Sequence, residues 1–126
     1  LDACNLLGNI RDEGIMYALY ANSHLLIVAS SREGFPMVIM EAMMQGVVPI
    51  STAVGGIPEH VQSNENGILV KEIEGKKIVE SFVKHFENLN QNRSDMQRLS
   101  QNAQAYAILH FDHQTFINAY IRLLKS

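Results

Sequence analysis

The sequence has few cysteines and prolines, no excess of positive charge and no long apolar run, and each of these absences argues against a class of protein. Its 126 residues include one cysteine, Cys4, so no disulfide can form within the chain and a reducing cytosol is compatible with it. Only three prolines and a hydrophobic fraction of 47% argue against disorder. A net charge of −3 gives no basic footprint for nucleic acid, so no such partner is expected. No apolar run reaches the roughly 18 residues that a membrane span needs.

What is present instead is an alternation of apolar runs and helical patterns. The run at residues 24–29 is continuous, as expected for a parallel strand that helices cover on both faces. In chain order, the strand candidates are residues 3–7, 24–29, 47–51 and 68–70. Helical connections between such strands form right-handed βαβ units. The sequence therefore predicts an α/β fold with a parallel sheet of about four strands.

Helix signals lie between these strands. The predicted helices of this part cover residues 12–22, 36–45 and 57–62. Asp12 is placed to cap the first, whose Ile15 and Leu19 are expected to face inward. Pro36 is placed at the first position of the second, where its missing N–H costs nothing. Gly46 is a natural end for that helix, because glycine adopts the left-handed conformation readily.

Beyond residue 72 the pattern is helical throughout. Apolar residues recur at helical spacing in three predicted helices. Ser94 and Gln97 have the spacing of a capping box that opens the second of them, and Asp112 is placed to cap the third. We therefore interpret the chain as a single partial domain, with an α/β core at residues 1–72 and a C-terminal helical segment at residues 73–126.

The most informative stretch is EGFPMVIMEAM at residues 33–43. It places Glu33 on a turn and Glu41, with seven residues between them, inside an otherwise apolar helix. A helix that is apolar all round is a buried helix, and an ionised glutamate is almost never buried without a partner. We therefore expect Glu41 to reach a polar cavity and to hold a ligand there.

The start of this helix is suited to a phosphate group. The N–H groups of a first helical turn and the positive end of the helix dipole attract anions, and Gly34 lets a ligand approach the backbone closely. Glu41 lies roughly 7 Å along the helix axis from Pro36, at about 1.5 Å per residue, whereas Glu33 lies at the mouth. The two glutamates are hydrogen-bond acceptors on either side of an anion site. This arrangement suits a ligand with a central diphosphate and hydroxyl groups at both ends, such as a nucleotide-sugar.

Several ordered segments resemble one known family. The pair Glu33 and Glu41 resembles the E-x7-E motif of the retaining glycosyltransferases of family 4, whose two Rossmann-like domains form the GT-B fold. The other matching segments are GNI at 8–10, YAN at 20–22, LLIVASS at 25–31, QGVVPIST at 45–52, VGGIPE at 54–59 and NGILV at 66–70. The last three resemble G-x-P-V-I-A-T, G-G-x-x-E and N-G-x-L-V. The resemblance covers most of the chain and implies the C-terminal, donor-binding half of a GT-B fold, a Rossmann-like three-layer parallel sheet that is truncated at its N-terminus and followed by helices.

The resemblance also implies roles for individual residues. Glu33 would contact hydroxyls of the donor sugar near the reacting carbon, and Glu41 would bind the ribose hydroxyls of the nucleotide. The backbone of Gly34, Phe35 and Pro36 would touch the sugar and the phosphates, although Pro36 has no N–H to donate. The expected donor-binding set is completed by Ser31, Met37, Val38, Gly55 and Gly56, with Ser30 as an alternative hydroxyl.

No metal and no separate cofactor are expected. His110 and His113 straddle a predicted helix break instead of sharing one helical face, and no cluster of Cys or Glu accompanies them. The nucleotide-sugar is expected to act as the substrate.

The resemblance implies transfer of a hexosyl group from a nucleoside-diphosphate sugar to a glycan or lipid-linked acceptor, with retention at the anomeric carbon. The family's diphosphate-binding Arg and Lys and its N-terminal Rossmann-like domain have no counterpart here, and the sequence begins with Leu1. We therefore expect a piece of a larger protein that is inactive alone. Polysaccharide biosynthesis in the cytoplasm is the expected setting, and association with the inner face of the membrane is left open.

Two other functions are also compatible with the sequence. A non-catalytic nucleotide-binding or partner-docking α/β module stays open, as does a nucleotide-sugar epimerase of the GT-B type. A dinucleotide-dependent oxidoreductase is disfavoured, because no G-x-G-x-x-G opens a helix after a strand. The sequence identifies neither the base, nor the sugar, nor the acceptor.

Overall fold

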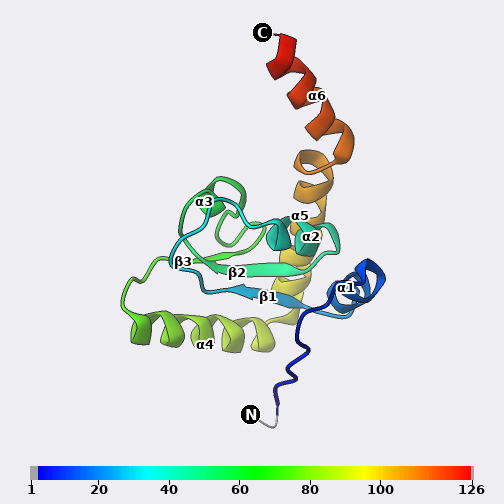
Figure 1. Cartoon of the computed structure of the whole chain (residues 1–126). Coiled ribbons are helices and arrows are strands. Elements are labelled where there is room, and N and C mark those ends of the chain that lie inside the picture. The colour runs from blue at the N-terminus through cyan, green and yellow to red at the C-terminus, as the bar shows by residue number, and fades with distance from the viewer. Residues whose placement is uncertain (1–2, 126) are drawn as a thin grey trace.

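The computed structural model describes residues 3–125, apart from the side chains at positions 115, 116, 119 and 120. Figure 1 shows the elements in their spatial arrangement. In chain order they are α1 (Glu13–Ala21), β1 (Leu25–Val28), α2 (Met37–Met44), β2 (Val48–Thr52), α3 (Ile57–His60), β3 (Ile68–Val70), α4 (Gly75–Gln91), α5 (Arg93–His110) and α6 (His113–Lys125).

The three strands form a parallel sheet in the order β1-β2-β3. Leu25 lies opposite Val48, and Ile50 lies opposite Ile68. Helix α4 lies along one face of the sheet, α2 and α3 lie on the other, and α5 runs from the α4 side to the α2 side (Figure 1). The predicted α/β fold, with a parallel sheet between helical layers, is confirmed.

Buried apolar side chains fill both faces of the sheet. The cluster on the α2 and α3 side contains Val28, Ile39, Met43, Ile57, Val61, Ala103 and Ala107. The cluster on the α4 side contains Val48, Ile50, Ile68, Val70, Phe82, Leu89 and Leu99. Every residue of β2 is buried, because the central strand of a parallel sheet is covered by helices on both sides. Full burial of each large aliphatic side chain contributes about 1.5–3 kcal/mol.

The predicted strand at residues 3–7 is wrong. Within the described residues, the sheet has three strands, and residues 4–10 form no regular structure. Leu6 is fully exposed and Leu7 is 59% exposed. A strand needs a neighbour to accept and donate its backbone hydrogen bonds, and no such neighbour lies beside this segment in the described structure.

Helix α1 begins as predicted, but the residues that face the core differ from the predicted ones. The Asp12 side chain accepts a hydrogen bond from the backbone N–H of Ile15 at 2.9 Å, which confirms the cap. Ile15 itself is 54% exposed, contrary to the prediction. Tyr20 is buried, and Met16 packs against the same cluster. The inward stripe therefore runs through positions 16 and 20, one residue later than expected.

Helices α2 and α5 begin at other residues than the sequence predicted. Pro36 has φ −71° and ψ 129° and precedes α2 as its N-cap instead of forming its first residue. The N-cap of α5 is Asn92, whose side chain accepts from the backbone N–H of Asp95 at 3.2 Å. The predicted capping box at Ser94 is therefore wrong, because Asn caps a helix as well as Ser does and stands two residues earlier.

The end of α2 and the start of α6 lie where the sequence predicts them. Gly46 has φ +73° directly after the C-cap residue of α2, in agreement with the predicted helix end. Helix α6 begins at His113, directly after Asp112, and extends away from the sheet (Figure 1). Among the described residues, none of the helices is both long enough and apolar enough to cross a membrane.

Candidate functional site

Two loops meet where the parallel strands end, at the edge of the sheet where α2 begins. One follows β1 and leads into α2, and the other follows β2 and leads into α3. The Thr52 hydroxyl donates a hydrogen bond to the backbone oxygen of Ser30 at 2.6 Å. The backbone N–H of Gly56 donates to the backbone oxygen of Gly34, also at 2.6 Å. The two loops are therefore joined at the carboxyl end of the sheet, where ligands of open α/β folds bind.

Gly55 and Gly56 make this close approach of the two loops possible. Gly55 has φ +56°, and a Cβ atom there would overlap the backbone carbonyl of Glu33. A Cβ atom on Gly56 would lie 2.9 Å from the oxygen of Gly34. Gly34 differs, because a Cβ atom added to it would meet no other atom within 4 Å. The structure thus places Gly55 and Gly56 against the loop of Glu33 and Gly34, and their contact with a donor stays a prediction.

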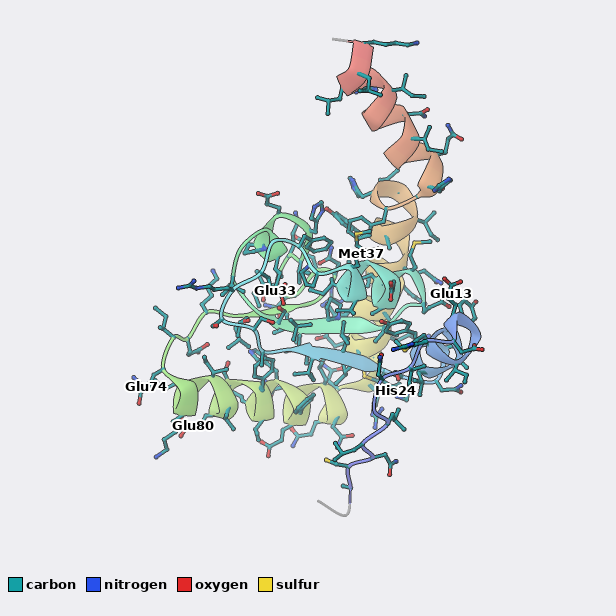
Figure 2. All side chains as sticks on the ribbon, viewed as in Figure 1. Glu13, His24, Glu33, Met37, Glu74 and Glu80 are labelled. Atoms are coloured by element: carbon teal, nitrogen blue, oxygen red, sulfur yellow. The ribbon has the colours of Figure 1, made fainter. Side chains whose placement is uncertain are left out.

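Glu33 lies on this loop, partly buried, just before the first turn of α2 (Figure 2). Its carboxylate oxygen Oε1 accepts a hydrogen bond from the Ser30 hydroxyl at 2.7 Å. Ser31, which was predicted to belong to the donor-binding set, is exposed. The hydroxyl that contacts Glu33 therefore belongs to Ser30, at the point where the chain leaves β1.

Helix α2 is not buried all round, contrary to the prediction. The residues that face the core are Ile39, Ala42 and Met43. Met37 is 66% exposed, Val38 is 40% exposed, and Glu41 is exposed on the same side of the helix. An apolar composition predicts burial, but the described part of the chain leaves this apolar face uncovered. Figure 2 shows Met37 at the first turn of α2.

Glu41 contacts α1 and lines a pocket, and its expected role of holding a ligand there stays a prediction. Its carboxylate oxygen Oε2 accepts a hydrogen bond from the Tyr20 hydroxyl at 3.0 Å. Both residues line a pocket of about 550 Å³ between α1 and α2. The residues lining this pocket are Ile10, Arg11, Glu13, Met16, Tyr17, Tyr20, Glu41, Met44 and Gln45. The pKa of Tyr20 is raised to about 12. Burial is the largest cause, followed by the hydrogen bond to Glu41 and by the negative charge of Glu41.

Of the residues that line this pocket, the sequence interpretation named only Glu41 as a site residue. Tyr20 precedes Glu41 by 21 positions, and no local pattern links them. The placement of α1 against α2 brings them together, and the signals in the sequence were the apolar spacing of Met16 and Tyr20 and the segment YAN at 20–22 that resembles the family. Arg11 lines the pocket beside the predicted cap Asp12 and supplies a positive charge there.

Phe35 anchors the loop with its side chain. Its ring centroid lies 4.6 Å from that of His60 in α3 and 5.6 Å from that of Phe111 at the end of α5. His110, weighed above as a metal ligand, stacks on Tyr106 at 4.2 Å. Within residues 3–125, as far as their side chains are described, no group of three or more His, Cys, Asp or Glu is arranged to hold a metal ion.

Comparison with known proteins shows the family. Residues 1–106 match the model of the glycosyl transferases group 1, and the chain belongs to this family. It is similar to an N-acetyl-alpha-D-glucosaminyl L-malate synthase from Bacillus anthracis, with 47% identity over 51 residues, which cover 40% of this chain and 13% of that protein.

Two solved structures show the same fold. A sucrose-phosphate synthase from Thermosynechococcus elongatus superimposes with a TM-score of 0.87 and 22% identity, over 98% of this chain and 30% of that one. HepE from Anabaena, solved in complex with UDP-glucose, superimposes with a TM-score of 0.76 and 27% identity, over 85% of this chain and 29% of that one. The chain therefore spans less than a third of the length of each relative. Membership of the glycosyl transferases group 1 and the predicted half of a GT-B fold are confirmed, whereas assignment to family 4 and retention at the anomeric carbon stay predictions.

Proposed function

We propose that this chain is the donor-binding part of a retaining glycosyltransferase, which transfers a hexosyl group from a nucleoside-diphosphate sugar to a glycan or lipid-linked acceptor. Membership of the glycosyl transferases group 1 supports the class of reaction. Similarity to HepE, which was solved with UDP-glucose, supports a nucleotide-sugar as the donor.

The observation that carries this proposal is the position of two acids around the start of α2. Glu33 precedes the helix, and Glu41 follows on its exposed side. The backbone N–H groups of Met37 and Val38 are in the first turn, where no intrahelical acceptor is available. Together with the dipole, equivalent to roughly half a positive charge, these donors suit the diphosphate of the donor.

The two ends of the donor are assigned to different regions. Glu33 orients the hydroxyls of the sugar, in the joined loops at the carboxyl edge of the sheet. Glu41 binds the ribose hydroxyls and is oriented for this by the Tyr20 hydroxyl. The nucleoside lies in the pocket between α1 and α2, whose volume of about 550 Å³ is within the usual range for small-molecule sites.

The chemistry assigned to these residues is positioning and charge stabilisation. Retaining transfer passes through an oxocarbenium-like transition state while negative charge grows on the departing diphosphate. The amides and dipole of the first turn of α2 are already oriented toward that charge. Glu33 and Glu41 need not act as nucleophile or general base, unlike the paired acids of glycoside hydrolases. They increase the rate by holding the donor in the reactive geometry.

The isolated chain is proposed to be inactive. Met37 and Val38 leave an apolar surface beside the proposed diphosphate site, which suits contact with a second wall of the cleft. The N-terminal Rossmann-like domain of the family is the proposed source of that wall. Polysaccharide biosynthesis in the cytoplasm is the proposed setting, with association with the inner face of the membrane left open. A measured transfer rate from residues 1–126 alone would contradict the proposed inactivity.

A calorimetric panel tests the donor assignment. The intact protein that contains this sequence is titrated with UDP-, GDP- and ADP-sugars, and we expect saturable binding of one series. Glu33→Ala and Glu41→Ala should both impair binding or turnover of that series. Glu80→Ala is the matched control, because this acid lies on α4, on the opposite face of the sheet (Figure 2). Absence of binding for all three series, or equal behaviour of all three variants, would contradict the proposal.

A further inference from the structure

A cluster of aromatic rings lies behind the proposed donor loop. The ring of Phe35 packs against His60 and Phe111, and the rings of His60 and Phe111 lie 5.2 Å apart. Tyr106 adds a fourth ring, 5.6 Å from Phe111. These rings come from the loop before α2, from α3, and from α5 with its C-cap residue. The cluster therefore joins the loop of Glu33 to two elements far away in the sequence.

His60 is fixed at the centre of this cluster by both its ring and its backbone. Its Nδ1 atom lies 2.9 Å from the hydroxyl oxygen of Tyr106, within hydrogen-bond distance. Its backbone oxygen accepts a hydrogen bond at 3.0 Å from the side chain of Asn66. Asn66 is buried and also accepts from the backbone N–H of Gln62 at 2.8 Å. A half-buried side chain held in this way has little freedom to move away from Phe35.

Helix α3 holds the donor loop at two points. At its start, the backbone N–H of Gly56 donates to Gly34. At its last residue, the His60 ring packs on Phe35. The two residues held by these contacts, Gly34 and Phe35, directly follow Glu33. The position of the Glu33 backbone therefore depends on both contacts.

We infer that His60 is a positioning residue for the donor sugar: packed on Phe35 and fixed by Tyr106, it holds the loop that carries Glu33 without touching the donor itself. This inference rests on the proposed function, which gives Glu33 its contact with the sugar. It assigns a role to a residue on α3 that the E-x7-E motif does not include.

The test compares two ligands in the intact protein, the nucleotide-sugar that it binds and the matching nucleoside diphosphate without sugar. His60→Ala should weaken the nucleotide-sugar by roughly threefold to tenfold, the range expected for losing one aromatic pair, and leave the nucleoside diphosphate nearly unchanged. His60→Phe keeps a ring against Phe35 and should recover most of the loss. Phe86→Ala, which removes a partly exposed ring on α4, is the matched control and should leave the ratio of the two affinities unchanged.

Two further measurements keep the test decisive if His60→Ala folds poorly. Tyr106→Phe removes one hydroxyl and should shift the affinity ratio in the same direction by a smaller factor. Hydrogen exchange of the Gly56 amide should become faster in the His60 and Tyr106 variants and stay unchanged in Phe86→Ala. An unchanged ratio and unchanged exchange in these variants would overturn the inference alone. Failure of the unsubstituted protein to bind any nucleotide-sugar would instead overturn the proposed function.

Discussion

The two acids of the E-x7-E motif lie in regions that are built differently. Glu33 lies on one of two loops that are joined by a backbone hydrogen bond and by a hydrogen bond from the Thr52 hydroxyl, and the neighbouring backbone leaves no room for a Cβ atom at Gly55. Glu41 lies on an exposed helix face beside a pocket of about 550 Å³, and its described contact is one hydrogen bond from Tyr20. The difference indicates that the first region fixes geometry, whereas the second leaves space for a ligand.

Under the proposed function, the two regions have different roles in binding the donor. A change in the joined loops is expected to alter the fold locally and the position of Glu33. A change beside Glu41 is expected to alter affinity for the nucleotide while the fold is retained. Variants in the two regions should therefore differ in which of these quantities they change.

The largest effect is expected at Gly55. Gly55→Ala places a Cβ atom against the carbonyl of Glu33 at a backbone φ of +56°. Left-handed strain and overpacking together should lower the free energy of unfolding of the intact protein by about 2–5 kcal/mol. Gly34→Ala is the matched control, because its Cβ meets open space, and should change stability by less than about 1 kcal/mol. Equal stability of the two variants in denaturant titrations would contradict the close approach of the loops.

An intermediate effect is expected at Glu41. Glu41→Ala should weaken binding of the nucleoside diphosphate by about 1–3 kcal/mol, the range for a lost hydrogen bond to a charged group. Tyr20→Phe removes the hydroxyl that orients this carboxylate and should cost less. Glu33→Ala should leave affinity for the nucleoside diphosphate nearly unchanged and lower kcat with the nucleotide-sugar. Calorimetry with steady-state kinetics checks the division, and a reversal of the two phenotypes would contradict it.

The smallest effect is a titration. Tyr20 has a pKa of about 12 in the folded protein, compared with an ordinary value of 10.0. Because the fold favours the neutral hydroxyl, the stability that it contributes is intact below pH 10 and is lost as the pH rises from 10 to 12. Burial also raises the pKa of Tyr106, so ultraviolet absorbance should show both tyrosines ionising late, and Glu41→Ala should bring down the pKa of Tyr20 alone. A Tyr20 pKa that does not respond to Glu41→Ala would show that the two side chains are not in contact.

Much of the fold could be predicted from the sequence, because its signals are local. The continuous apolar run at β1, the cap at Asp12 and the stop at Gly46 each depend on residues within a few positions. The strand predicted at residues 3–7 failed, because a strand depends on a neighbour that no local pattern reveals. The cap of α5 was misplaced for a smaller reason, since Asn92 and Ser94 are equally suitable by residue type.

Less of the site could be predicted. The apolar composition of α2 predicted burial, whereas the structure exposes Met37, Val38 and Glu41 on one face. Composition shows that a helix tends to be covered but not by which segment. The contact between Tyr20 and Glu41 depends on how α1 packs against α2. The requirement for Gly55 follows from the approach of two loops, which became visible only in three dimensions.

A crystal structure of the intact protein with its nucleotide-sugar tests the central claim most directly. We expect the diphosphate within hydrogen-bond distance of the Met37 and Val38 amides, the sugar against Glu33, and the ribose against Glu41. A diphosphate bound elsewhere, with Glu33 still paired only to Ser30 and Glu41 only to Tyr20, would contradict it.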